Sequence, residues 1–231
     1  MQLTPTNILA ESHNRKIPFG HEHCSNKSSY SVAQKAVIAT TTAIGVATSL
    51  ALLSKSAGYS LKPSKMFKNI KNSFLANVDF EAKEVISIGA GSCLGGLIGG
   101  YLIDKNPQNR QSKKREAIMQ MGNISIPIIS VTAFSKLGSK LNKTAEGIAA
   151  ILGLFAGVHI ANFVMNKVSN AIFNNKTEER GVKATDFSAH VDDMLVAANC
   201  ISKNKYVHRL ARIVPAALII PGFEVGTKEK D

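Results

Sequence analysis

Four stretches without a charged residue constrain this chain more than any other feature. They cover 36–54, 85–103, 117–135 and 147–166, so each is 19 or 20 residues long, although the chain carries 28 Lys and Arg and 16 Asp and Glu elsewhere. A helix needs about 20 mostly apolar residues to cross the hydrocarbon core of a bilayer, and charge at its centre is costly. The pattern therefore predicts an all-α, polytopic helical membrane protein with about four transmembrane helices.

A soluble protein with buried helices is the alternative, because Thr, Ser, Asn and Gly dilute these stretches. A soluble core helix normally keeps a polar or charged face, whereas these four carry no charge on any face. The first stretch also follows a long polar segment, so we expect a retained first span rather than a cleaved signal peptide. These points favour a multi-pass membrane protein.

The stretches divide the chain into three parts. Residues 1–35 are predicted to be a polar, disordered N-terminal tail. Residues 36–166 are predicted to form the four-span bundle. Within it, the connector at 55–84 has apolar residues at helical spacing and lysines at other positions, which predicts an amphipathic helix that lies on the membrane surface or packs on the protein's own loops. Residues 167–231 form a basic C-terminal region with an amphipathic helix at 187–201. The apolar run 213–223 is too short to span and is expected to be interfacial or re-entrant, with a fifth span as the lesser option.

Basic residues indicate which ends of the helices face the cytoplasm. The short segment 104–116 contains five of them, and with a cytoplasmic N-terminus the cytoplasmic segments up to residue 186 hold 13 Lys and Arg against 9 on the other side. Binding of the 55–84 connector to a cytoplasmic leaflet would invert this orientation. We expect the basic loops to contact anionic lipids and, since they lack interleaved aromatics, no nucleic acid.

Glycines repeat every four residues in the second stretch, at Gly91, Gly95 and Gly99. Such a stripe lets another helix approach closely, within the chain or in a homo-oligomer. Aligning residue 84 with residue 146 superposes this stripe on Gly153, Gly157 and Ala161, which suggests two tandem hairpins. The string 89–95 also imitates a dinucleotide-binding turn, but Leu94 stands where the third glycine is required, so no cofactor is predicted.

Polar residues inside the predicted spans are the candidates for a pathway. Gln120 and Asn123 precede Pro127, which breaks helical hydrogen bonding and frees a backbone carbonyl. His159 and Asn162 lie in the fourth stretch, where polar side chains usually face protein or water. They predict either the polar pathway of a small transporter or channel, or hydrogen bonds between helices.

Asp186, His190 and Asp193 share one face of the predicted C-terminal helix and are weak candidates for a metal site. One helical face rarely completes a coordination shell, so a solvated face is favoured and no metal is predicted. No Walker, G-x-S-x-G or H-E-x-x-H motif is present, which disfavours an enzyme. The leading hypothesis is a structural or assembly component packed through its glycine stripes.

Overall fold

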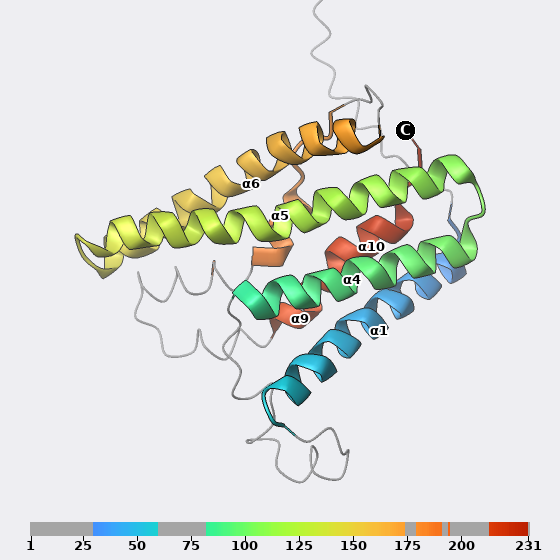
Figure 1. Ribbon diagram of the computed structural model, residues 1–231, viewed down its shortest axis with the longest axis horizontal. Helices are drawn as coiled ribbons and strands as arrows, with labels where there is room; N and C mark the ends of the chain where they lie inside the picture. The colour runs from blue at the N-terminus through green and yellow to red at the C-terminus, as the bar shows by residue number, and fades with distance from the viewer. Residues whose placement is uncertain (1–29, 60–81, 174–178, 191–193, 195–212, 231) are drawn as a thin grey trace, which may run out of the picture.

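The computed structural model describes residues 30–59, 82–173, 179–190, 194 and 213–230. Its regular elements are all helical (Figure 1). They are α1 (Val32–Ser56), α4 (Ala82–Ile103), α5 (Pro107–Ser139), α6 (Lys143–Phe173), η2 (Ala184–His190), α9 (Val214–Ala217) and α10 (Ile219–Thr227). Four of them are long and apolar enough to cross a membrane, so the predicted fold class is confirmed. The tail at 1–29, the connector at 60–81 and nearly all of 191–201 lie outside the described residues.

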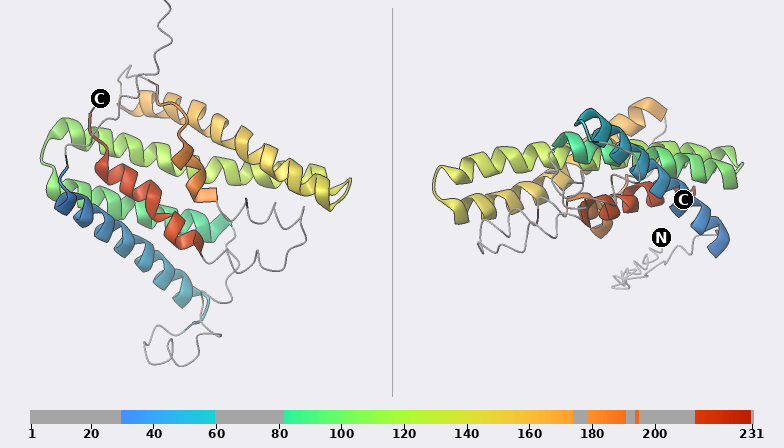
Figure 2. Two further views of the ribbon diagram at one scale, coloured as in Figure 1. Left: turned by 180° about the vertical axis from the view of Figure 1, so that it is seen from behind. Right: turned by 90° about the horizontal axis from the view of Figure 1, so that it is seen from below.

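The four long helices form two antiparallel hairpins, α1 with α4 and α5 with α6 (Figures 1 and 2). A short turn at 104–106 joins the hairpins, so α4 and α5 also run in opposite directions. The helices α9 and α10 lie along α4, between α1 and the C-terminal segment that contains η2 (Figure 2). We call the end that contains the 104–106 turn the Asp104 end.

The helix α5 begins ten residues earlier than the predicted span. The basic segment 104–116, expected to be a loop, is helical from Pro107 onward. The local sequence explains this start, because the Asn106 side chain accepts a hydrogen bond from the Gln108 N–H at 3.0 Å and Pro107 occupies the first helical turn, where its missing N–H costs nothing. The charged beginning of α5 is therefore continuous with the third long apolar helix.

The register between α4 and α5 brings that charged beginning beside the uncharged part of α4. A Cβ placed on Gly100 would approach the Lys113 side chain to 2.8 Å, and one placed on Gly89 would overlap Ile124. Lys113 and Glu116 thus lie at the depth of the glycines of α4 rather than beyond its end. Because charge at this depth is costly, both residues need partners inside the protein.

Glycines mark the helix contacts. Those at 91, 95 and 99 face α1, where an added Cβ would overlap atoms of Ile38, Thr41, Gly45 or Ser49. Gly153 and Gly157 face α5 at Pro127, Ser130 and Phe134 in the same way. Each of these stripes therefore lies against the first helix of its own hairpin, and Ala161, at the position equivalent to Gly99, is fully buried.

The large apolar side chains of the long helices point outward. In α4 the buried positions are mostly glycine, serine and cysteine, whereas Leu94, Ile98 and Leu102 are each about 60% exposed. In α6 the exposed residues include Leu152, Phe155 and Phe163. Small residues inside and large apolar residues outside reverse the usual arrangement of a soluble helical bundle.

Candidate functional site: a buried polar file on α5

Five residues of α5 form a buried file that leads from the Asp104 end toward the middle of the helix. They are Lys113, Glu116, Gln120, Asn123 and Pro127. Their spacings of three and four residues place them on one face of the helix. Each of the four polar residues is at most 3% exposed. Most partners of this file come from the C-terminal segments 180–190 and 213–228, and Lys113 is also bound by Tyr30 and Asp104.

Lys113 holds three distant parts of the chain together. Its Nζ donates to the Tyr30 hydroxyl at 2.7 Å and to the Lys228 carbonyl at 2.6 Å, and it lies 3.4 Å from a carboxylate oxygen of Asp104. The start of α1, the 104–106 turn and the C-terminal segment therefore meet at one buried ammonium group, which Asp104 neutralises.

The neighbours of Asp104 keep its carboxylate ionised. Burial alone would raise its pKa, but hydrogen bonds from Tyr30, the Asn106 backbone and Asn109, together with the charge of Lys113, outweigh burial and lower the pKa to about 2. Burial and the hydrogen bond to Asp104 conversely raise the pKa of Tyr30. The carboxylate thus stays ionised beside a neutral phenol.

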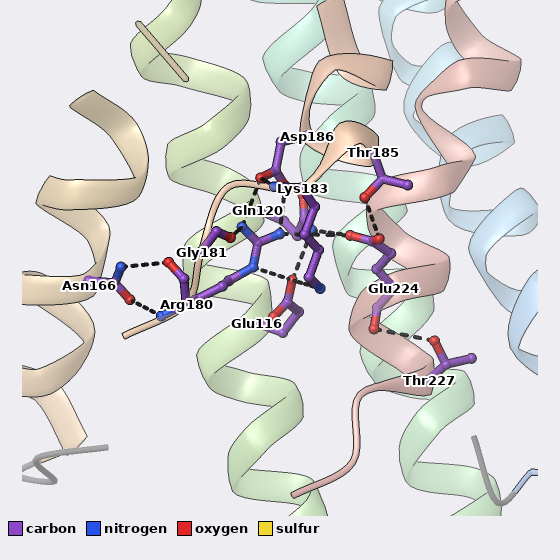
Figure 3. Close-up of polar contacts among 10 residues, drawn as sticks. All are labelled: Glu116, Gln120, Asn166, Arg180, Gly181, Lys183, Thr185, Asp186, Glu224 and Thr227. Atoms are coloured by element: carbon purple, nitrogen blue, oxygen red, sulfur yellow. Dashed lines mark hydrogen bonds and ion pairs between the residues drawn. The ribbon is translucent and has the colours of Figure 1, made fainter. Parts of the chain in front are cut away.

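One turn further along α5, Glu116 joins an ion-pair cluster centred on Arg180 (Figure 3). The guanidinium binds Asp186 through two nitrogens at 2.9 and 2.5 Å, and its Nε lies 3.1 Å from Glu116. A third carboxylate, that of Glu224, lies 3.9 Å from the guanidinium. The Arg180 side chain is therefore surrounded by carboxylates while only 10% exposed.

Gln120 connects this cluster to α10. Its amide nitrogen donates to Glu116 at 2.9 Å and to Glu224 at 2.6 Å, and the Thr185 hydroxyl donates to the other oxygen of Glu224 at 2.6 Å (Figure 3). One amide group with two N–H bonds thereby bridges two carboxylates that would otherwise repel each other. The segment around η2, α5 and α10 are joined through these bonds.

The backbone around Arg180 is also fixed. The Asn166 side chain on α6 accepts from the Arg180 N–H at 3.0 Å and donates to its carbonyl at 2.9 Å. The Lys183 N–H donates to Asp186 at 2.8 Å. The short segment after α6 is thus held by side chains rather than by regular secondary structure, which positions the guanidinium between its carboxylates.

Pro127 leaves the carbonyl of Asn123 without its helical donor, because proline has no N–H to bond the residue four positions earlier. His190 fills that position, since its Nε2 lies 2.7 Å from this carbonyl oxygen. A carbonyl can only accept, so Nε2 carries the proton. His190 is fully buried and Asn123 is 1% exposed, so the bond replaces a buried backbone hydrogen bond.

The side chain of Asn123 is unsatisfied. Its Nδ2 and Oδ1 are both buried and have no hydrogen-bond partner among the residues that the structure describes, and the same holds for the Asn162 Oδ1 and the Ser169 Oγ. Buried amides are usually paired, because an unpaired group costs about 1–3 kcal/mol.

The structure separates the residues of the predicted pathway. Gln120, Asn123 and Asn162 are buried, whereas His159 is exposed on the outer face of α6 among apolar side chains. Gln120 and Asn123 belong to the polar file, but His159 does not.

The weak metal candidates are engaged otherwise. Asp186 is 1% exposed and bound by Arg180, and His190 bonds the Asn123 carbonyl. The two lie in a 3₁₀ helix rather than on one face of an α-helix, and Asp193 lies outside the described residues. Among the residues that the structure describes, no group of three His, Cys, Asp or Glu side chains could hold a metal ion.

Sequence reasoning missed Glu116, Arg180 and Glu224, although the spacing 113, 116, 120, 123, 127 was a usable signal for the α5 face. The partners lie 64 and 104 residues away along the chain from Glu116 and Gln120, and no local pattern connects them. Comparison with protein-family models, curated proteins and solved structures gave no significant match.

Proposed function

We propose that this chain is an integral, multi-pass membrane protein with a structural or assembly role, in which the glycine stripes bring the helices together within the chain. The observation that carries the proposal is the outward placement of the large apolar residues. Leu94, Ile98 and Leu102 on α4 and Phe155 and Phe163 on α6 are more than half exposed, while the glycines of both helices are buried.

This arrangement suits lipid and does not suit water. In a bilayer, helices gain nothing from hiding large apolar side chains from one another, so they associate through small residues that permit close van der Waals contact. In water, the same faces would expose rows of large apolar side chains, which mark interaction surfaces rather than the free surface of a soluble monomer. The polar file supports the proposal too, because its charges are paired inside the bundle and not turned outward.

Fractionation tests the membrane part of the proposal. Expressed protein should stay in the membrane pellet through carbonate and urea extraction and should be released by detergent. Recovery of folded, monodisperse protein from the aqueous fraction without detergent would contradict it.

The packing role is tested with a matched glycine control. We expect Gly95→Leu and Gly157→Leu to disrupt folding, because their new side chains would meet Thr41 of α1 and Pro127 of α5. Gly181→Leu serves as the control, since no atom of the described residues lies within 4 Å of a Cβ at that position. The packing role is refuted if all three variants fold and run as the parent does on size exclusion in detergent.

The stripe glycines are used within the chain, so a homo-oligomer would need other faces. The orientation of the N-terminus toward the cytoplasm and the binding of anionic lipids at the basic segments remain part of the proposal. Both are tested by labelling in oriented vesicles and by comparing flotation with anionic and zwitterionic liposomes.

A small transporter or channel is the second candidate. The amide of Asn123, on the same face as Glu116 and Gln120, has no partner among the described residues, which favours this candidate because water or a polar solute could pair such a buried group. Solute or ion flux into liposomes containing the protein, abolished by Asn123→Leu, would raise this candidate above the structural one. Flux indistinguishable from protein-free liposomes would remove it.

A further inference from the structure

We propose that the C-terminal part of the chain forms a third membrane-crossing hairpin, docked on α4 and α5, whose two limbs have the ends His190 and Val214 beside the first half of α4, away from the Asp104 end. This inference rests on the proposed membrane location. It assigns a transmembrane position to α9 and α10, whose apolar run was expected to be interfacial or re-entrant. It also makes the chain's own C-terminal segment the partner of the polar file.

The first limb runs from Arg180 to His190 along α5. Arg180 pairs with Glu116, and His190 bonds the carbonyl of Asn123, seven residues further from the Asp104 end. Ile124, next to that carbonyl, lies against Gly89, close to the start of α4. The first limb has therefore passed the middle of α4 by the time it reaches His190.

The second limb runs back along α4. Val214 and Leu218 belong to one packed cluster with Leu53 at the end of α1 and Val85 at the start of the uncharged part of α4. Figure 1 shows α9 beside the start of α4. Further along, the Gly222 N–H donates to the Ser92 hydroxyl at 3.2 Å.

The same direction continues to the Asp104 end. An added Cβ on Gly226 would overlap the Gly96 carbonyl, and the Lys228 carbonyl accepts from Lys113. α9 and α10 thus run parallel to α4, from the start of its uncharged part to its last turns (Figure 2). The stretch Val214–Thr227 covers about 21 Å at the helical rise, so the crossing is short relative to a hydrocarbon core of about 30 Å.

Protein surroundings explain why such a short helix can carry Glu224. Its carboxylate is bonded by Gln120 and Thr185, and α10 packs on α4, α1, α5 and η2. Glycine faces glycine at this contact, Gly222 and Gly226 against Gly96 and Gly100, which allows the helices to approach closely. A helix lined by protein in this way need not satisfy the length and charge limits of a lipid-facing span.

The positions of the two limbs determine where the connection emerges. His190 bonds Asn123, whose neighbour Ile124 lies against Gly89, and Val214 packs with Val85, so both lie beside the first half of α4. Lys83 and Glu84, just before Val85, mark the charged boundary on that side. The basic residues 203, 205, 209 and 212 would then face the same side as the α5–α6 turn. These four residues raise the count of Lys and Arg on that side from 9 to 13, and Lys228 and Lys230 raise the count on the Asp104 side from 13 to 15. The difference is then too small for the positive-inside rule to decide the orientation.

Single-cysteine labelling of the full chain tests this inference. Cys24 and Cys200 are replaced by Ser, the buried Cys93 is kept, and one cysteine is introduced at a time by Gln111→Cys, Ser139→Cys, Ser202→Cys or Lys230→Cys. Sealed vesicles are treated with a membrane-impermeant maleimide before and after permeabilisation. We expect Ser202→Cys to react from the same side as Ser139→Cys, and Gln111→Cys and Lys230→Cys to react from the other.

Labelling of Ser202→Cys from the same side as Gln111→Cys would overturn the third hairpin while leaving the membrane proposal intact. Reaction of all four sites irrespective of membrane integrity would instead refute the membrane location and the inference with it. A protease-cleavable tag inserted after Ser202 provides the second measurement if that thiol is unreactive. Its cleavage from the Ser139 side supports the inference, and its cleavage from the Gln111 side overturns it.

Discussion

The hydrogen bond between His190 and the carbonyl that Pro127 leaves free makes a specific prediction about stability. Replacing His190 by Leu removes the donor but keeps much of the side-chain volume. The Asn123 carbonyl is then a buried acceptor without a partner, which costs about 1–3 kcal/mol in the free energy of unfolding. In a Pro127→Ala background, the new N–H of residue 127 can bond that carbonyl, so His190→Leu should cost about 1 kcal/mol less there.

The four chains of this double-mutant cycle can be compared by unfolding with SDS in mixed micelles. Far-UV circular dichroism is the suitable signal, because the chain has no Trp and its regular structure is helical. His159→Leu is the matched control, since His159 is exposed on α6, and its stability should stay near that of the parent. Equal costs of His190→Leu in both backgrounds, within about 0.5 kcal/mol, would refute the proposed link between the two residues.

Three further predictions concern the packing of the C-terminal segment. Arg180→Met should destabilise the fold by about 3–5 kcal/mol in the same unfolding assay, because Glu116 and Asp186 lose their buried cation. Adding Glu116→Gln and Asp186→Asn should restore most of this stability, and an unchanged midpoint for Arg180→Met would contradict the buried ion pair. The pKa of Asp104 is lowered from 3.8 to about 2, so its carboxylate contributes stability that is present above its usual pKa and lost as the pH falls toward 2. Asp104→Asn should therefore be less stable than the parent at neutral pH and should lose less stability on acidification, and parallel pH profiles of the two proteins would argue against this contribution. Gly96→Leu should release α10 from α4, because the new side chain would overlap the Gly222 carbonyl. Limited proteolysis should then cleave the C-terminal segment earlier than in the parent or in Gly181→Leu, and identical cleavage rates in all three proteins would count against the contact.

Charge distribution and helix periodicity were enough to predict the number and approximate place of the four long helices, although α5 and α6 have 33 and 31 residues where about 20 were expected. Those features are local, since an uncharged run of about 20 residues has few other stable conformations in a membrane protein. Helix ends were less well predicted. The segment 107–116 is too charged to be recognised as part of a span, yet it continues α5 because Asn106 and Pro107 start the helix before it.

The candidate site depended on tertiary structure. In the sequence, Pro127 predicts a backbone carbonyl without a helical hydrogen bond, and the spacing of Gln120 and Asn123 predicts a polar helix face. The groups that form hydrogen bonds with them lie in other parts of the chain. His190 is 67 residues from Asn123, and Glu224 is 104 residues from Gln120. Only folding brings such groups to hydrogen-bonding distance. The sequence by itself determined that this chain makes long apolar helices with glycine-lined faces. The tertiary structure decided which charges those helices can bury, because a charge is tolerated there only when its partner is delivered by a segment distant along the chain.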